Sequence, residues 1–227
     1  MIKLSPRLQA VADLVPPSRC VADIGTDHAL LPLYLVEQGI VARVIAVEKE
    51  AGPAIVARRT VAARGLMDRI EVRVGDGLFP LRPGEAEIIV LAGLGGEKIA
   101  TILAHGIETA RTARQLVLQP MNRAAVLRRW LAENAWRIAT ETLVAEKKWL
   151  YQIITAAPGK EGQLSWLEAE LGPCLLASHH PLLPELIRRL IIRYEQELAG
   201  LAQASGEQIT ARRAELRYRL SQLRALR

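Results

Sequence analysis

Short apolar runs alternate with amphipathic segments along the first 159 residues of the chain. The apolar runs are rich in Val, Ile and Leu and cover 19–24, 41–47, 70–74, 87–92 and 116–118. Runs of this length and composition are typical of buried parallel strands. In the segments around them, apolar residues recur at helical spacing, which predicts helices over 6–15, 30–38, 52–63, 97–109 and 123–134.

The end of this region has a different pattern. Two extended segments, 136–144 and 149–156, flank a short turn and predict a β-hairpin. Strands that alternate with helices and close on a hairpin are typical of a doubly wound α/β sheet with an antiparallel edge. Such sheets bind ligands at the carboxyl ends of their strands. We therefore expect residues 1–159 to form one ligand-binding α/β domain.

The pattern changes again at the Pro- and Gly-rich segment 158–162, beyond which no strand is predicted. One apolar stripe at helical spacing runs from Leu182 to Leu201, and a second runs from Ile209 to Leu223 after a turn at Ser205-Gly206. Two such stripes joined by a turn predict an antiparallel, coiled-coil-like helical hairpin. We expect residues 160–227 to form this second domain.

Composition adds two constraints. The formal net charge is +6, and only six of the 30 basic residues are lysine. Arginine suits phosphate recognition, although a basic enzyme without a nucleic-acid partner would show the same excess. The two cysteines, Cys20 and Cys174, predict neither a disulfide nor a metal site.

No apolar run approaches the ~18 residues of a spanning helix, so we expect a cytoplasmic protein that is neither exported nor embedded in a membrane.

The turn after the first predicted strand carries the first sign of a ligand. Here Gly25 lies between Asp23 and Asp27. The dinucleotide fingerprint needs further glycines and places a diphosphate where these carboxylates would repel it. A nicotinamide oxidoreductase is therefore disfavoured. The turn suits a ligand with a cationic or zwitterionic end, as in S-adenosylmethionine.

Acidic residues also end the next two predicted strands. Glu48 stands where an acidic residue in nucleotide-binding sheets accepts hydrogen bonds from ribose hydroxyls. Asp76 lies between Gly75 and Gly77 and can accept the amino group of an adenine. Alternatively, Glu48 is a solvent-exposed glutamate and the Gly-Asp-Gly triplet is only a turn. Together with Asp23, the three carboxylates indicate a site for an adenosine without phosphates.

Motifs at successive strand ends resemble one known family. They are Asp23–Ala29 with Leu31-Pro32, Gly75-Asp76-Gly77, Ala92–Gly96 and Gln119-Pro120, and together they resemble the TrmK family of bacterial tRNA (adenine-22-N1)-methyltransferases. Leu171-Gly172-Pro173 and Pro181-Leu182 resemble the family's C-terminal domain, so the resemblance spans nearly the whole chain. Two departures are Leu94, where methionine is usual, and Met121, which separates Pro120 from Asn122.

The resemblance implies a class I (Rossmann-like) methyltransferase that transfers a methyl group from S-adenosyl-L-methionine to N1 of adenine 22 in the D-loop of tRNA. It implies cofactor contacts at Asp23, Gly25, Thr26, Glu48, Lys49, Asp76, Gly77, Ala92 and Gly93. It implies substrate contacts at Leu94, Gly95, Gly96, Gln119, Pro120, Asn122 and Arg123, and no metal. Gly95-Gly96 alternatively forms an anion nest or a tight packing contact.

Catalysis is expected to depend on alignment, because neutral adenine already has a lone pair at N1. Asp27 is the candidate for stabilising the cationic product ring, or alternatively an N-cap of the following helix. His28 stacks on or orients the base, or is structural. The histidines His179 and His180 have no metal-ligand spacing and are given no catalytic role.

The N1 atom lies on the pairing edge of adenine, so the target base must be unpaired or extruded and the RNA must be held. The candidates for this are arginines on predicted helices, each of which alternatively belongs to a solvated face: Arg58, Arg59, Arg123, Arg128, Arg129, Arg188, Arg189, Arg212, Arg213, Arg217 and Arg219. We expect a monomer, with the C-terminal hairpin as the surface for any dimer. The rival functions are methylation of a small molecule or protein, and a non-catalytic RNA-binding or interaction module.

Overall fold

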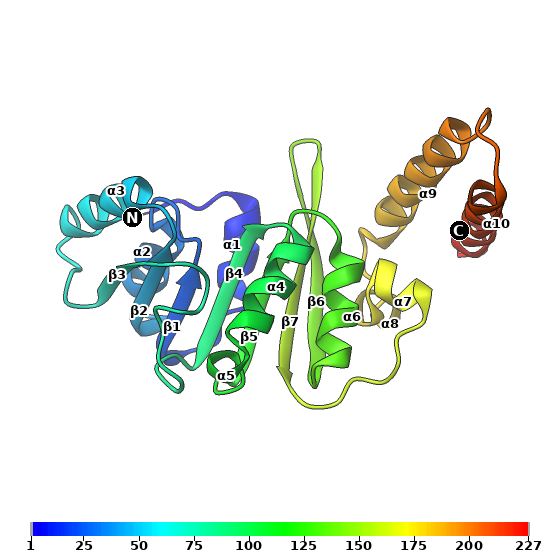
Figure 1. The fold of residues 1–227 in the computed structure, drawn as a ribbon. Coiled ribbons are helices and arrows are strands. Elements are labelled where there is room, and N and C mark those ends of the chain that lie inside the picture. Colours follow the sequence, from blue (N-terminus) through cyan, green and yellow to red (C-terminus); the bar gives the residue numbers. More distant parts are fainter. Residues whose placement is uncertain (1, 227) are drawn as a thin grey trace.

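A seven-stranded sheet forms the centre of the protein in a computed structural model that describes residues 2–226. The strand order is β3-β2-β1-β4-β5-β7-β6. The first five strands are parallel, and β7 and β6 add an antiparallel edge, as the sequence predicted (Figure 1). The strands are β1 (Ser18–Ile24), β2 (Val41–Glu48), β3 (Ile70–Val74), β4 (Ile88–Leu94), β5 (Gln115–Pro120), β6 (Trp136–Glu146) and β7 (Trp149–Pro158).

Helices cover both faces of the sheet, because alternate residues of each central strand point to opposite sides. In β1, Val21 packs into one apolar cluster, while Ala22 and Ile24 pack into the other. The first cluster lies under α1 (Pro6–Asp13), α2 (Leu30–Glu37) and α3 (Ala51–Ala62). The second lies under α4 (Gly96–His105), α5 (Ile107–Ala110) and α6 (Ala124–Glu133). Burial on both faces explains the unbroken apolar runs.

The sequence predicted one helix over 97–109, and the structure divides it at Gly106 into α4 and α5. A β-carbon at Gly106 would lie 2.5 Å from Cβ of Leu78, in the loop that follows β3. The helix therefore breaks where that loop packs against it. This contact joins segments far apart in sequence, so local periodicity does not report it.

The C-terminal part contains the predicted hairpin of α9 (Leu183–Gly200) and α10 (Glu207–Arg224), which extends beyond the β6 edge of the sheet (Figure 1). Two short helices, α7 (Trp166–Leu171) and α8 (Pro173–Ala177), were not predicted, since neither is long enough to show a stripe. A capping box between Ser165 and Glu168 begins α7 and is the one local signal of it.

A third apolar cluster joins these helices to the sheet. It contains the buried faces of α9 and α10 together with Leu143 of β6. The division of the chain at 159/160 and the coiled-coil character of the hairpin stay predictions. No helix among residues 2–226 is both long and apolar enough to cross a membrane.

Candidate functional site

Backbone hydrogen bonds to the neighbouring strand, β2, fix the turn after β1. The amides of Gly25 and Thr26 both donate to the carbonyl of Val47, at 2.8 and 3.1 Å. Gly25 has φ +79°, and Asp27 also has a positive φ, of +46°. A left-handed backbone conformation favours glycine and is tolerated by Asp. The chain thus turns sharply at the carboxyl edge of the sheet and leaves the Asp27 side chain in solvent.

Asp27 is not the N-cap of the following helix. The N-cap of α2 is Ala29, whose position has no side-chain capping bond. The Asp27 carboxylate is largely exposed, and its Oδ1 lies 3.5 Å from Nε2 of His28. The N-capping alternative is therefore wrong, and the carboxylate is available to a ligand.

A cavity of about 200 Å³ opens at this turn, between the ends of β1 and β4 and beneath α1. It brings together eight residues that the sequence predicted for the site, although they come from separate motifs. Four further residues were not predicted: two from α1 and two from α2. The lining is Arg7, Leu8, Asp23, Gly25, Thr26, Asp27, His28, Leu30, Leu31, Ala92, Gly93 and Leu94.

Asp23 gives this cavity a buried acidic group. Its side chain is almost fully buried, and burial raises the pKa of its carboxyl to about 6, with the negative charge of Glu48 acting in the same direction. A carboxylate that is desolvated and repelled by a neighbour is stabilised by a cation. The cavity therefore suits a positively charged group close to Asp23.

Glu48 and Asp76 lie farther along the same edge and outside the lining of this cavity. Glu48 is half-buried, and its Oε1 accepts a hydrogen bond from the amide of Glu50 at 3.2 Å. Asp76 is exposed and pairs with Nζ of Lys49 at 2.9 Å, a contact that lowers the pKa of the Asp76 carboxyl. Gly77 is buried beneath it. The three strand ends carry carboxylates in a row, as predicted, because β1, β2 and β3 are neighbours in register.

The loops after β4 and β5 are joined through Gln119. Its Oε1 accepts hydrogen bonds from the Gly93 amide at 3.0 Å and from Nη1 of Arg7 at 2.7 Å. Gln119 and Pro120 are both buried, so neither is placed to touch a substrate directly. The structure gives them a supporting position beneath Gly93 instead. Arg7 had no motif around it, so sequence reasoning missed it.

The two glycines before α4 are explained by packing. A β-carbon at Gly96 would lie 2.5 Å from the carbonyl oxygen of Arg123, and the Gly96 amide already donates to the Asn122 carbonyl at 3.0 Å. Gly96 is buried, which favours the packing alternative over an anion nest or a base contact at that residue. Gly95 is less buried, and a β-carbon there would meet Oδ1 of Asn122 at 3.2 Å. Asn122 and Arg123 themselves are exposed.

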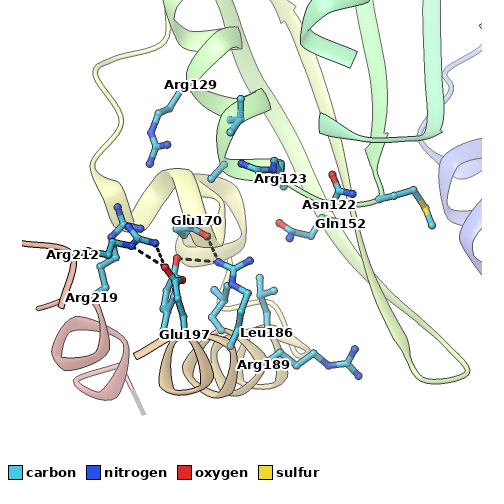
Figure 2. A pocket seen from close by; sticks show the side chains of 17 residues that line it. Asn122, Arg123, Arg129, Gln152, Glu170, Leu186, Arg189, Glu197, Arg212 and Arg219 are labelled. Carbon is cyan, nitrogen blue, oxygen red and sulfur yellow. Dashed lines mark hydrogen bonds and ion pairs between the residues drawn. The ribbon is translucent and has the colours of Figure 1, made fainter. Parts of the chain in front are cut away.

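A second and larger cavity, of about 690 Å³, lies between the β5–α6 loop and the C-terminal helices. We call it the arginine groove. Figure 2 shows Arg123 and Arg129 on the wall formed by α6 and the loop before it, and Arg189 and Arg212 on the opposite wall. Six arginines and two glutamates line the groove, so its net charge is positive: Arg123, Arg129, Arg189, Arg193, Arg212 and Arg219 against Glu170 and Glu197.

Several groove arginines are held by acidic partners. Arg193 lies 3.3 Å from Glu170, and Nε of Arg212 donates to Glu197 at 2.8 Å. Arg129 differs, because its guanidinium makes no hydrogen bond or ion pair within the described part of the chain. Arg129 is therefore the cation of the groove that is most available to an anion.

Arg128 corrects one expectation. The sequence placed it among the solvent-facing arginines, but its side chain is fully buried and pairs with Glu141 at 2.6 Å. Its other donors reach the carbonyl of Ala169 and Oε1 of Gln152. Arg128 thus links α6 to the sheet edge and to α7, and it is removed from any RNA-binding surface. His180 is structural, since its ring contacts Thr142 and the amide of Leu182.

Among the described residues, no group of three or more His, Cys, Asp or Glu side chains is suited to hold a metal ion. The cavity suits the cationic end of the cofactor expected from the sequence, because Asp23 and Asp27 line it. Glu48 and Asp76, the residues expected to hold the adenosine, lie outside it.

Comparison with known proteins places this site in a family. Residues 4–154 match the family described as "Methyltransferase domain". A tRNA (adenine(22)-N(1))-methyltransferase of Bacillus subtilis is 40% identical over 158 residues, which cover 70% of this chain and 66% of that protein. The crystal structure of the B. subtilis m1A22 tRNA methyltransferase TrmK superposes with a TM-score of 0.92 and 32% identity over 99% of both chains.

A relative has also been crystallised with the expected cofactor. A Streptococcus pneumoniae protein in complex with S-adenosyl-L-methionine shares 31% identity and a TM-score of 0.84, with 98% of this chain and 99% of that chain covered. These likenesses extend over the α/β sheet and the C-terminal helices alike. The chain belongs to the TrmK family of S-adenosylmethionine-dependent methyltransferases.

Proposed function

We propose that this protein transfers the methyl group of S-adenosyl-L-methionine to N1 of adenine 22 in tRNA. One observation carries the proposal: eight of the predicted site residues, from the motifs that follow β1 and β4, line one cavity at the carboxyl edge of the sheet. The family relationship supports it, because the B. subtilis relatives are described as methyltransferases acting on this nucleotide. The arginine groove next to the site would supply a surface for a polyanionic substrate.

The cofactor site is assigned to the three acidic strand ends. Asp23, Gly25, Thr26, Ala92 and Gly93 surround the cavity and would hold the methionine part. Glu48 would contact the ribose hydroxyls, and Asp76 with Gly77 would contact the adenine. Lys49, which pairs with Asp76 at 2.9 Å, would hold that carboxylate in position. When bound, the cofactor supplies an electrophilic methyl group on a sulfonium. The buried Asp23 carboxylate would stabilise that positive charge.

The acceptor base would enter past Gly93 and Leu94, where the cavity is bounded by small or flexible residues. The neutral base needs no general base, since N1 carries a lone pair, so the chain contributes alignment and charge stabilisation. Asp27 is exposed at the cavity and lies beside His28, which suits a role in stabilising the cationic ring. Gly95 and Asn122 would border the base, while Gly96, Gln119 and Pro120 would support the loops from beneath.

The tRNA would lie along the arginine groove. Arg123 and Asn122 belong both to the predicted substrate site and to the lining of the groove, so the groove leads to the acceptor side of the sheet. Residues 160–227 contribute Arg189, Arg193 and Arg212 to the opposite wall. The C-terminal helices would thus act as a tRNA-contacting domain.

The decisive experiment maps the methylated nucleoside. Purified protein, tRNA and S-adenosylmethionine are incubated, and the tRNA is digested and analysed by mass spectrometry. We expect 1-methyladenosine at position 22 and none in a tRNA in which that adenine is replaced. Methylation of another position, or of a small molecule or protein only, would refute the acceptor assignment.

Calorimetry separates the enzyme from a non-catalytic RNA-binding module. The protein should bind S-adenosylmethionine, and Asp23→Ala and Glu48→Ala should each weaken binding at least about tenfold, because each removes a charged or hydrogen-bonding contact. An absence of binding would refute the enzyme assignment. Binding that both substitutions leave unchanged would refute the site.

The groove has its own test. Arg129→Glu should weaken tRNA binding and lower the slope of log affinity against log salt, since fewer counterions are released. S-adenosylmethionine affinity should stay unchanged, because Arg129 is absent from the cofactor cavity. Arg19→Glu is the matched control, because Arg19 is exposed and lies outside the groove.

A further inference from the structure

We propose that the tip of the β6–β7 hairpin binds an unpaired nucleotide of the tRNA. The tip consists of Lys147, Lys148 and Trp149, and we call it the β-hairpin tip. The Trp149 ring would stack on the base of that nucleotide, and the two lysines would contact phosphates. The assignment rests on the proposed function and adds to it an RNA contact that lies outside both the cofactor cavity and the arginine groove.

The β-hairpin tip projects from the edge of the sheet that holds the cofactor cavity. Strand β7 is antiparallel to β5, with Leu118 opposite Ile154. Strand β5 ends two residues after Leu118, whereas β7 begins five residues before Ile154. The hairpin therefore extends about 10 Å beyond the carboxyl end of β5, at about 3.3 Å per residue. Figure 1 shows it reaching past the other strands. An RNA that approaches this edge from solvent would meet the tip.

Two hydrogen bonds connect the β-hairpin tip to its surroundings. The amide of Arg7, a residue of the cofactor cavity, donates to Oε2 of Glu146 at 2.9 Å. On the other side, Nη1 of Arg189 donates to the carbonyl of Lys148 at 2.9 Å. Arg189 also lines the arginine groove. The tip thus lies between the cavity and the groove, on the path of an RNA that follows the groove to the acceptor site.

The side chains of the β-hairpin tip suit a nucleotide. All three are exposed, and Trp149 remains 54% exposed although Nζ of Lys148 lies 5.2 Å from the centre of its ring. An exposed aromatic ring can stack on any base, and neighbouring cations attract the phosphates. Within residues 2–226, Lys49 is the only lysine whose ammonium makes a hydrogen bond or ion pair. Both lysines of the tip are therefore available to an RNA.

The folding of the hairpin does not account for these residue types. Glu146 pairs with Trp149, which leaves a two-residue turn, and Lys147 in that turn has φ +54°. Turns of this kind favour Gly, Asn or Asp at positive φ. A tryptophan ring that stays half exposed also gains less from burial than a core residue does. The residues of the tip fit an external ligand better than they fit the turn.

The experiment measures tRNA affinity over a range of salt concentrations for Trp149→Ala, Trp149→Phe, Lys147→Ala and Lys148→Ala. The affinities for a long RNA duplex and for S-adenosylmethionine are measured in parallel. Met67→Ala is the control for loss of an exposed apolar side chain, because Met67 is 66% exposed and lies outside both cavities. Arg19→Ala is the control for loss of a cation, because Arg19 lies at the amino end of β1, on the opposite edge of the sheet.

We expect Trp149→Ala to weaken tRNA binding about 5- to 150-fold, the loss typical of one stacked base, without changing the salt dependence. Trp149→Phe should bind nearly as well as the unsubstituted protein, since it keeps an aromatic ring. Each lysine substitution should lower the slope of log affinity against log salt by about 0.7–0.9. Binding of the duplex should be insensitive to Trp149→Ala, because its bases are stacked on one another. Both controls, and the S-adenosylmethionine affinity of every variant, should be unchanged.

Unchanged tRNA affinity in Trp149→Ala would overturn this inference alone, provided that the unsubstituted protein still forms 1-methyladenosine at position 22. Equal losses of tRNA and S-adenosylmethionine affinity would also overturn it, because the tip would then only support the fold of the cofactor site. A dimer that Trp149→Ala dissociates, with tRNA affinity unchanged, would overturn it in favour of a contact between two copies of the chain. If the protein methylates no tRNA adenine but binds tRNA through Trp149, the proposed function fails and this inference stands.

Discussion

Replacing Arg128 by methionine tests whether its buried ion pair orders the junction between the sheet and the C-terminal helices. Both side chains of the Arg128–Glu141 pair are fully buried. Arg128 donates to Glu141 at 2.6 Å, to Oε1 of Gln152 at 2.7 Å and to the carbonyl of Ala169 at 2.9 Å. The substitution keeps most of the side-chain volume but leaves four acceptors without this donor: these three and the carbonyl of Glu170.

The main cost is an uncompensated charge. In the variant, the Glu141 carboxylate stays buried and keeps only the Cys174 amide as a hydrogen-bond donor, at 2.9 Å. Removing one partner of a buried ion pair destabilises a protein by about 3–5 kcal/mol. For a chain of this length, each kcal/mol lowers the unfolding temperature by about 2–4 °C, so we expect a decrease of roughly 6–20 °C.

The assay is thermal and urea unfolding followed by circular dichroism. Arg188→Met is the matched control, because Arg188 pairs with Glu185 in solvent and exposed pairs contribute about 0–1 kcal/mol. Adding Glu141→Leu to Arg128→Met should recover part of the loss, since the orphaned charge disappears. A loss below about 1 kcal/mol for Arg128→Met, or no recovery in the double variant, would refute this reasoning.

Three further predictions follow from burial and close contacts. Asp23→Asn should raise the unfolding free energy by ~3 kcal/mol at pH 8 and change it little at pH 4. The Asp23 carboxyl has a pKa of about 6 in the folded protein against an ordinary 3.8, so its ionisation destabilises the folded state as the pH rises between those values. Urea unfolding at both pH values measures the difference in unfolding free energy. Gly172→Ala should lower the unfolding temperature, because Gly172 has φ +100° and a β-carbon would lie 2.5 Å from Oε2 of Glu141. Gly96→Ala should lower both the unfolding temperature and methyl transfer, because its β-carbon would meet the Arg123 carbonyl at 2.5 Å and shift the acceptor loop.

Each of these has a control or a contradicting result. Gly52→Ala in α3 meets nothing within 4 Å and should be neutral or stabilising by about 0.4–1 kcal/mol, which distinguishes close contact from a general effect of losing glycine. Equal stability of Gly172→Ala or Gly96→Ala and the unsubstituted protein would contradict the packing. A stability difference for Asp23→Asn that is the same at pH 4 and pH 8 would contradict the raised pKa.

Much of the sheet followed from local pattern. The run 70–74 predicted β3 at its observed bounds, and the other parallel strands differ by only a few residues at their ends. A strand buried on both faces must be apolar throughout, and a glycine must follow where the chain turns sharply. The helices α7 and α8 were not predicted, because six and five residues are too few to show a helical period.

The candidate site was likewise predicted only in part. Asp23, Gly25 and Asp27 were found because they lie together in sequence around one turn, and the structure places all three at the cavity. Arg7 was missed because α1 reaches that cavity only through the packing of the helix over the sheet. Arg128 was misassigned because a basic residue on a helix usually faces solvent, and only the position of Glu141 on β6 reveals its buried partner.

The sequence by itself determined the succession of strands and long helices along the chain, the chemical character of the strand ends and the family. These depend on residue type and on contacts between near neighbours in the chain. Tertiary structure alone decided which carboxylates share a cavity and which arginine lies beside them. It also decided which arginine is buried and which arginines line the arginine groove. These features depend on how distant segments of the chain pack together. Packing sets the distance between two charges and the dielectric constant of their surroundings, and neither quantity can be read from their separation in sequence.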